Sequence, residues 1–128
     1  MKKQFLALLA LPLLVAGCAT SITNLTPLQQ PRNANNVYPV EVAFDSTQQT
    51  IRWDSIEPHI LIGSEAIPMR GTLLMTNRWE GVVPVPPTAS TVTYRYKFDY
   101  ECNAFGKPKA GSQISKAYTL KIVPPEAH

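Results

Sequence analysis

The stretch Val92-Thr-Tyr-Arg-Tyr-Lys-Phe-Asp-Tyr-Glu-Cys102 decides the fold class of this chain. Apolar or aromatic residues, with the cysteine last, occupy every even position, and polar or charged residues occupy every odd one. A strict period of two is typical of a strand that packs one face on a core and exposes the other to water. We therefore predict a half-buried strand over residues 92–102, with Phe98 at the centre of its buried face.

Two further segments show the same period. Residues 37–44 alternate in the first half of the chain, and residues 115–123 alternate near its C-terminus. The second segment is predicted to pair with residues 92–102 as an antiparallel hairpin, around a turn-rich connection over residues 103–112. The inward positions of the two segments are Tyr38, Val40, Val42, Phe44, Tyr118, Leu120 and Ile122.

Shorter strand candidates lie between these segments, at residues 50–54, 59–62 and 70–77. In the first of them Ile51 and Trp53 are expected to point inward. Three prolines restrict residues 81–87 to a loop or a sheet edge. Six or seven short strands separated by turn signals predict an all-β fold, a single small antiparallel β-sandwich similar to immunoglobulin-like or fibronectin-type domains. We place this domain at residues 37–124, followed by a short tail at 125–128.

The N-terminus carries a different signal. Lys2 and Lys3 precede an apolar run, Phe5 to Ala16, which is too short to span a bilayer. The end of this run and the two residues after it read Leu14-Val-Ala-Gly-Cys18. This segment resembles the lipobox of bacterial lipoproteins. The resemblance implies a signal peptide over residues 1–17, cleavage between Gly17 and Cys18, and lipidation of Cys18. The alternative is an ordinary cleaved signal peptide that leaves an unmodified Cys18.

Residues 18–36 are rich in Asn, Gln and Thr, are interrupted by Pro27 and Pro31, and show no sustained apolar period. They predict a flexible tether between lipid and domain. An edge strand over residues 21–25, which alternate weakly, is the alternative. Ala19 follows the cysteine, and by resemblance to enterobacterial sorting this favours the bacterial outer membrane. The expected location is therefore the periplasmic face of that membrane, with the cell surface as the alternative.

Charge and motif content restrict the function classes. The formal charge of +3 includes Lys2 and Lys3, and after cleavage ten Lys and Arg face nine Asp and Glu, which argues against nucleic-acid binding. His59 is the only internal histidine and lacks a set of co-ligands. Cys102 continues an apolar strand face, as an inert thiol would. We expect no catalytic residue, metal site or cofactor.

The candidate interaction residues are aromatic or charged. Tyr94 and Tyr96 belong either to the core or to an open face that stacks on a ligand. The other candidates are Arg95, Lys97, Phe105 and Trp79. The favoured function is a structural or adaptor lipoprotein that binds another envelope protein. The alternatives are a carbohydrate- or peptidoglycan-binding module and a hydrolase inhibitor, and the solvent exposure of the aromatic side chains separates the adaptor from the carbohydrate binder.

Overall fold

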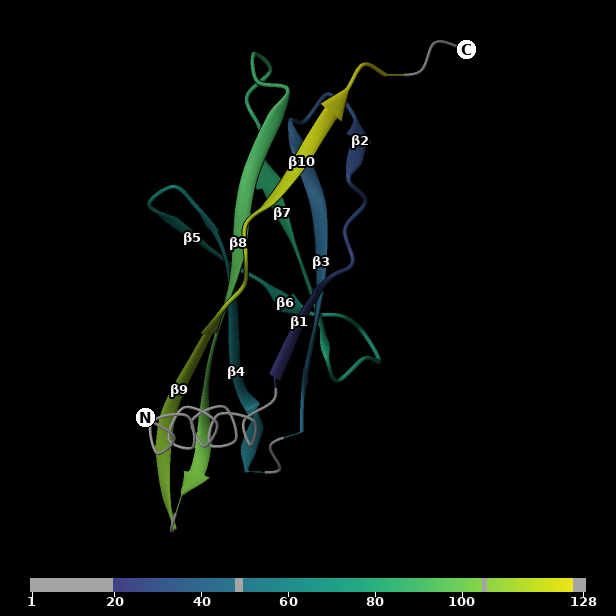
Figure 1. Ribbon diagram of the computed structural model, residues 1–128. Coiled ribbons are helices and arrows are strands. Elements are labelled where there is room, and N and C mark those ends of the chain that lie inside the picture. Colours follow the sequence, from purple (N-terminus) through teal and green to yellow (C-terminus); the bar gives the residue numbers. More distant parts are fainter. Residues whose placement is uncertain (1–19, 48–49, 105, 126–128) are drawn as a thin grey trace, which may run out of the picture.

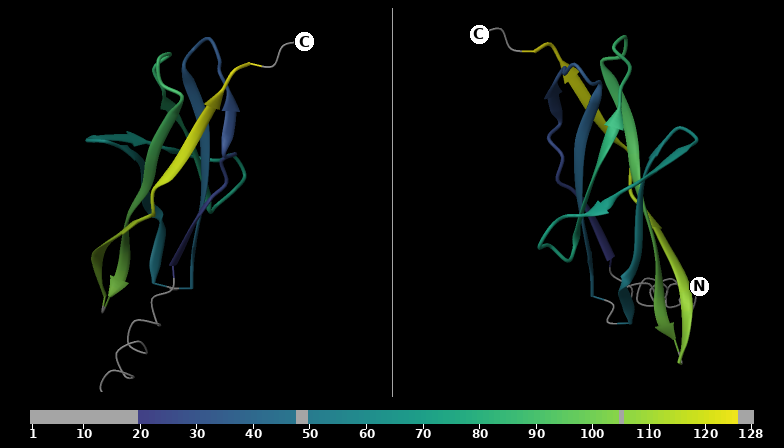
Figure 2. Two further views of the ribbon diagram at one scale, coloured as in Figure 1. Left: turned by 45° about the horizontal axis from the view of Figure 1, so that its top comes forward. Right: turned by 180° about the vertical axis from the view of Figure 1, so that it is seen from behind.

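The computed structural model describes residues 20–47, 50–104 and 106–125, which form strands and no helix (Figure 1). Within these residues, no helix is long and apolar enough to cross a membrane. Two sheets pack face to face, as three views of the ribbon agree (Figures 1 and 2). The strands are β1 (Thr20–Asn24), β2 (Gln29–Pro31), β3 (Val37–Ser46), β4 (Ile51–Ile62), β5 (Glu65–Pro68), β6 (Arg70–Gly71), β7 (Arg78–Pro84), β8 (Thr91–Ala104), β9 (Lys107–Ile114) and β10 (Tyr118–Val123).

The strand order is that of an immunoglobulin-like sandwich, so the predicted fold class is confirmed. One sheet runs β1-β3-β7-β6, and the other runs β2-β10-β8-β4-β5, with β9 also paired to β8. These orders correspond to the ABED and GFC sheets of immunoglobulin domains. The parallel pair of β2 with β10 is the exception among otherwise antiparallel neighbours.

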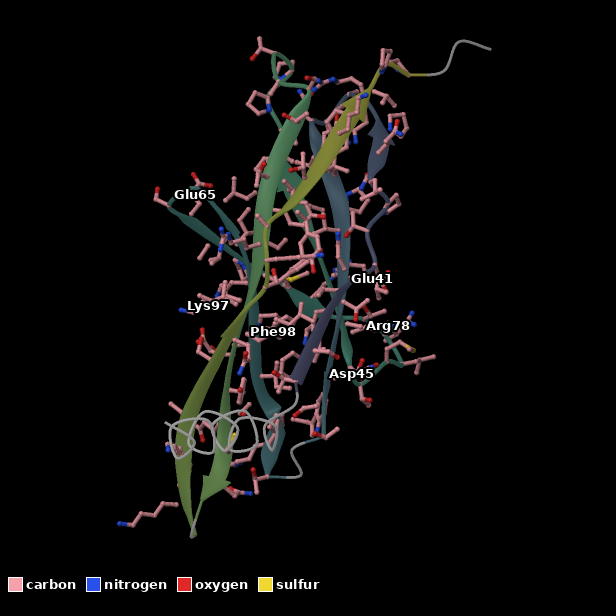
Figure 3. The ribbon with its side chains drawn as sticks, in the orientation of Figure 1. Glu41, Asp45, Glu65, Arg78, Lys97 and Phe98 are labelled. Carbon is pink, nitrogen blue, oxygen red and sulfur yellow. The ribbon has the colours of Figure 1, made fainter. Side chains whose placement is uncertain are left out.

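The strand quoted first forms the middle of the core, as β8. Its even-numbered residues from Tyr94 to Tyr100 are buried between the sheets, and Phe98 stacks on Phe44 of β3 with ring centroids 4.6 Å apart. In Figure 3, Phe98 points into the sandwich, whereas Lys97 points away from it on the other side of β8. The predicted faces of residues 37–44 are also confirmed, since all four inward positions are buried.

The prediction of a flexible tether is wrong for residues 20–36, and the edge-strand alternative is confirmed. β1 pairs with β3 from Thr20↔Ser46 to Asn24↔Val42. The Tyr96 hydroxyl donates to Asn24 Oδ1 at 2.7 Å, and Asn24 Nδ2 donates to the Tyr94 hydroxyl at 3.1 Å. Tyrosines of the core therefore hold a segment whose composition alone predicts disorder. The sandwich begins at Thr20 rather than Val37.

The same network buries the Tyr96 hydroxyl. It lies 3.2 Å from Thr26 Oγ1, which also accepts the Glu41 N–H at 2.9 Å. Burial raises the pKa of Tyr96 well above its ordinary value, and burial together with Tyr94 raises the pKa of Tyr118. Burial therefore disfavours the ionised form of both phenols.

Trp53 is not in the core, contrary to prediction. A bulge in β4 shifts its register with β8 between Arg52 and Glu57, so that the buried positions change from odd-numbered Ile51 to even-numbered Ile56. Ser55 supports the bulge, since its Oγ donates to the Arg52 carbonyl at 2.6 Å and accepts the Glu101 N–H at 2.8 Å. Trp53 is 41% exposed, and its ring makes an edge contact with Phe44.

The connection predicted over residues 103–112 is instead mostly strand. β8 and β9 form a hairpin arm, from Lys97↔Ile114 to Ala104↔Lys107, that projects beyond the sandwich (Figure 2). β10 then continues along the same side of β8, which confirms the predicted antiparallel pair. At the junction Ser115 replaces a ladder bond, because its Oγ accepts the Tyr96 N–H at 2.9 Å.

Residues 70–77 also depart from the predicted strand. Only Arg70 and Gly71 form a strand, β6, and a turn follows in which the Met75 N–H donates to the Thr72 carbonyl at 3.0 Å. β7 then begins at Arg78 and includes the first part of the proline-rich segment. Gly81–Pro84 pair with β3 alone, so the predicted position of this segment at a sheet edge is confirmed.

Candidate functional site: a groove at the open edge of β7

The aromatic residues predicted as interaction candidates belong to the core. Tyr94, Tyr96 and Trp79 are all buried. The hypothesis that Tyr94 and Tyr96 form an open binding face is therefore wrong, and so is the hypothesis that Trp79 is an exposed interaction residue. The alternation of residues in β8 places its aromatic rings on one face of the sheet. The sequence could not show that a second sheet covers this face.

The charged candidates lie on the solvated face of β8. Arg95 is exposed, and Lys97 Nζ lies 3.8 Å from Asp99 Oδ2. An exposed pair of this kind contributes little binding or stability. Phe105 and Cys18 lie outside the described residues, so their predicted roles stay predictions.

A more defined feature is an apolar groove of about 650 Å³ between the β5–β6 crossing and β7. Its residues come from β3, from the crossing and from β7. They are Pro39, Ile67, Pro68, Met69, Arg70, Glu80, Gly81 and Val82.

The groove forms where the chain changes sheets. β5 pairs with β4 in one sheet, and β6 pairs with β7 in the other, so Met69 lies at the crossing, where its N–H donates to the Pro58 carbonyl at 3.1 Å. Gly81 allows this close approach: a Cβ there would lie 3.0 Å from Ile60 Cδ1 and 3.4 Å from Met69 Cγ. The side chain of Met69 therefore lies over the β7 backbone and provides a flexible apolar wall.

The adjoining edge of β7 has no strand partner among the described residues beyond Glu80. β6 pairs only with Trp79 and Glu80. The Thr72 N–H donates to the Arg78 carbonyl at 2.9 Å, which shows that even-numbered residues of β7 direct their backbone groups away from β3. The N–H and C=O of Val82 therefore face the open edge, next to a side chain that is 49% exposed.

Two other edges of the described structure, those of β9 and β5, carry features that discourage pairing. β9 begins with Lys107-Pro108-Lys109, and β5 is a short strand with Glu65 at one end and Pro68 at the other. Lysines, prolines and short length are common protections of an edge strand. Residues 81–83, in contrast, read Gly-Val-Val and carry no charge.

The chemistry available in the groove is contact and hydrogen bonding. Its charged side chains, Arg70 and Glu80, pair with each other at 3.2 Å between Nε and Oε1, so its rim favours neither sign of ligand. Among the described residues, no cluster of three or more His, Cys, Asp or Glu side chains could hold a metal ion. His59 lies half-buried within β4, rather than at the start of a strand as predicted.

No protein-family model matches the chain, and no curated protein matches it at a significant level. The groove was not predicted, because it joins Pro39 to residues some 30 to 40 positions later in the chain. The available signal was the proline-rich segment, which identified the edge but not the apolar wall beside it.

Proposed function

We propose that the protein is a lipid-anchored adaptor of the bacterial cell envelope, which binds an extended segment of another envelope protein along the edge of β7. The observation that carries the proposal is the uncharged, unpaired edge at Gly81–Val83 beside an apolar groove. Addition of a strand to such an edge is a recurring mode of peptide recognition, in which backbone hydrogen bonds provide affinity and pockets read alternate side chains.

The position of the edge suits an adaptor. β1 begins at Thr20, opposite Ser46 of β3, whereas Val82 lies opposite Pro39 and Pro84 opposite Val37. The open edge is thus nearer to the end of β3 that is remote from Thr20. With Cys18 lipidated, the edge faces away from the bilayer, where a partner can reach it.

The groove defines the chemistry of the partner. A segment paired with Val82 would direct alternate side chains against Ile67 and Met69, so we expect apolar residues at every second position. The carbohydrate alternative loses support, because the aromatic side chains on which it depended are buried.

Site-specific photocrosslinking tests this proposal. A photoreactive residue is placed at Val82 of the full chain in native membranes, and at Ile114 of β9 as a matched control of similar exposure, 49% against 55%. We expect a discrete protein adduct from position 82 and none from position 114, whose strand has a Lys-Pro-Lys edge. Equal adducts at both positions, or none at position 82, would contradict it.

A further inference from the structure

The loop between β6 and β7 exposes three consecutive apolar side chains, which are not part of the groove. Leu73 is 84% exposed, Leu74 is 94% exposed, and Met75 follows at 40%. Leu74 has a φ of +67°, a left-handed conformation in which Gly or Asn would be more stable. Adjacent exposed apolar side chains of this kind are typical of a surface that contacts a protein or a membrane.

The loop lies at the same end of the sandwich as the start of β1. Arg78, which follows the loop, is opposite Ala43 of β3, and Thr20 is opposite Ser46 of the same strand. Asn77 fixes the loop there, since its carbonyl accepts the Phe44 N–H at 3.0 Å and its Nδ2 donates to Asp45 Oδ1 at 3.0 Å. Figure 3 shows Asp45 and Arg78 on this side of the molecule.

The chain between the lipidation position and β1 is short. Cys18 precedes Thr20 by two residues, and two fully extended residues span only about 7 Å. β1 is paired from its first residue, so no tether separates the domain from its anchor. If Cys18 is lipidated as proposed, the end of the sandwich that carries Leu73, Leu74 and Met75 is held close to the lipid surface.

We propose that Leu73, Leu74 and Met75 insert into the bilayer leaflet that holds the acyl chains of Cys18, as a second membrane contact. This inference rests on the lipid anchor of the proposed function. The three side chains enter the boundary between headgroups and acyl chains, where apolar side chains are stabilised. Two separate contacts fix the orientation of the domain, which a lipid attached through a flexible tether would not do.

Depth-dependent fluorescence quenching tests the insertion. The full-length lipoprotein, in a Cys102→Ser background, carries Thr76→Cys labelled with an environment-sensitive fluorophore, and it is reconstituted into phosphatidylethanolamine–phosphatidylglycerol vesicles that contain nitroxide-labelled lipid. Thr88→Cys, in the β7–β8 connection at the opposite end, is the remote control. We expect at least twofold stronger quenching at position 76 than at position 88.

A second pair of proteins separates insertion from proximity. Leu73→Ser combined with Leu74→Ser should leave the fold intact, since both side chains are exposed, but should reduce quenching at position 76 at least twofold. Unchanged quenching would overturn the insertion while leaving the anchor intact. Quenching at position 76 no stronger than at position 88 would also overturn it. Vesicle flotation reads the anchor separately: a protein that does not float refutes both. A change in the fluorescence of the label at position 76 that depends on Leu73 and Leu74, and that occurs in native membranes but not in these vesicles, would instead indicate that the loop binds a protein partner.

Discussion

Replacement of Tyr96 by Phe probes the network that holds the N-terminal segment in the fold. The change removes one hydroxyl and keeps the ring, whose packing between the sheets is unaffected. The lost contacts are those to Asn24 Oδ1 at 2.7 Å, Thr26 Oγ1 at 3.2 Å and the Glu41 carbonyl at 3.3 Å. Each partner keeps another bond, because Asn24 Oδ1 accepts the Thr26 N–H, Thr26 Oγ1 accepts the Glu41 N–H, and the Glu41 carbonyl accepts the Leu25 N–H. The expected loss of unfolding free energy is therefore about 1–1.5 kcal/mol.

Asn24→Ala should cost more, about 2–3 kcal/mol, since it removes the partner of both Tyr94 and Tyr96 and of the Thr26 N–H. The two changes share a bond, so the double variant should lose less than the sum of the single losses by at least about 0.5 kcal/mol. Tyr100→Phe is the control, because the Tyr100 hydroxyl only accepts a 3.3 Å bond from Gln113, and its loss should cost under about 1 kcal/mol.

Urea denaturation followed by tryptophan fluorescence measures these differences, with Trp79 as a buried reporter. A segment that behaved as a tether would give a different result. Asn24→Ala and Tyr96→Phe would then each fall within about 0.5 kcal/mol of the parent protein, with no coupling between them.

Three further predictions follow from the core, the buried phenol and the open edge. Phe98→Ala should lose about 3–5 kcal/mol of unfolding free energy and Lys97→Ala at most about 0.5 kcal/mol, as measured by chemical denaturation. A larger loss for Lys97→Ala than for Phe98→Ala would show that the buried face of β8 is wrongly assigned. The pKa of Tyr96 is raised in the folded state, so this group should not affect the unfolding free energy below about pH 10. Above that pH the unfolding free energy should fall by up to about 1.4 kcal/mol per pH unit. Stability measured over a pH series should fall less steeply for Tyr96→Phe than for the parent protein, and identical slopes would refute the assignment. Val82→Pro removes an N–H that faces the open edge and not β3. It should therefore abolish the partner adduct formed by a photoreactive residue at a neighbouring position, whereas Val82→Thr should retain that adduct. An adduct that survives the proline would exclude strand addition.

The sequence predicts the sandwich well where one face of a strand is apolar and the other polar. β3, β8 and β10 follow this rule, and the residues assigned to their inner faces are buried apart from Val92, Cys102 and Tyr118, which are only half-buried. The prediction fails where a local device changes the period. The bulge at Ser55 turns Trp53 outward, and a side-chain hydroxyl that makes such a bulge leaves no signal in hydropathy.

The N-terminal segment fails for a different reason. Its residues are polar, and polar composition predicts disorder when no partner is known. Asn24, Thr26 and Gln30 are instead satisfied by tyrosine hydroxyls and backbone groups of the sandwich, which are distant in sequence. The groove is equally non-local, since it needs Met69 to lie over Gly81 at a crossing between sheets.

The central claim, a domain held directly on a lipid at Cys18, is tested most directly by mass spectrometry of the mature protein extracted from membranes. We predict an N-terminal peptide that begins at Cys18 and carries acyl chains on that residue. Its mass should lose the acyl contribution after chemical deacylation, while the masses of the other peptides of the protein stay unchanged. A peptide that begins at Met1, or one that begins at an unmodified Cys18, would contradict the claim.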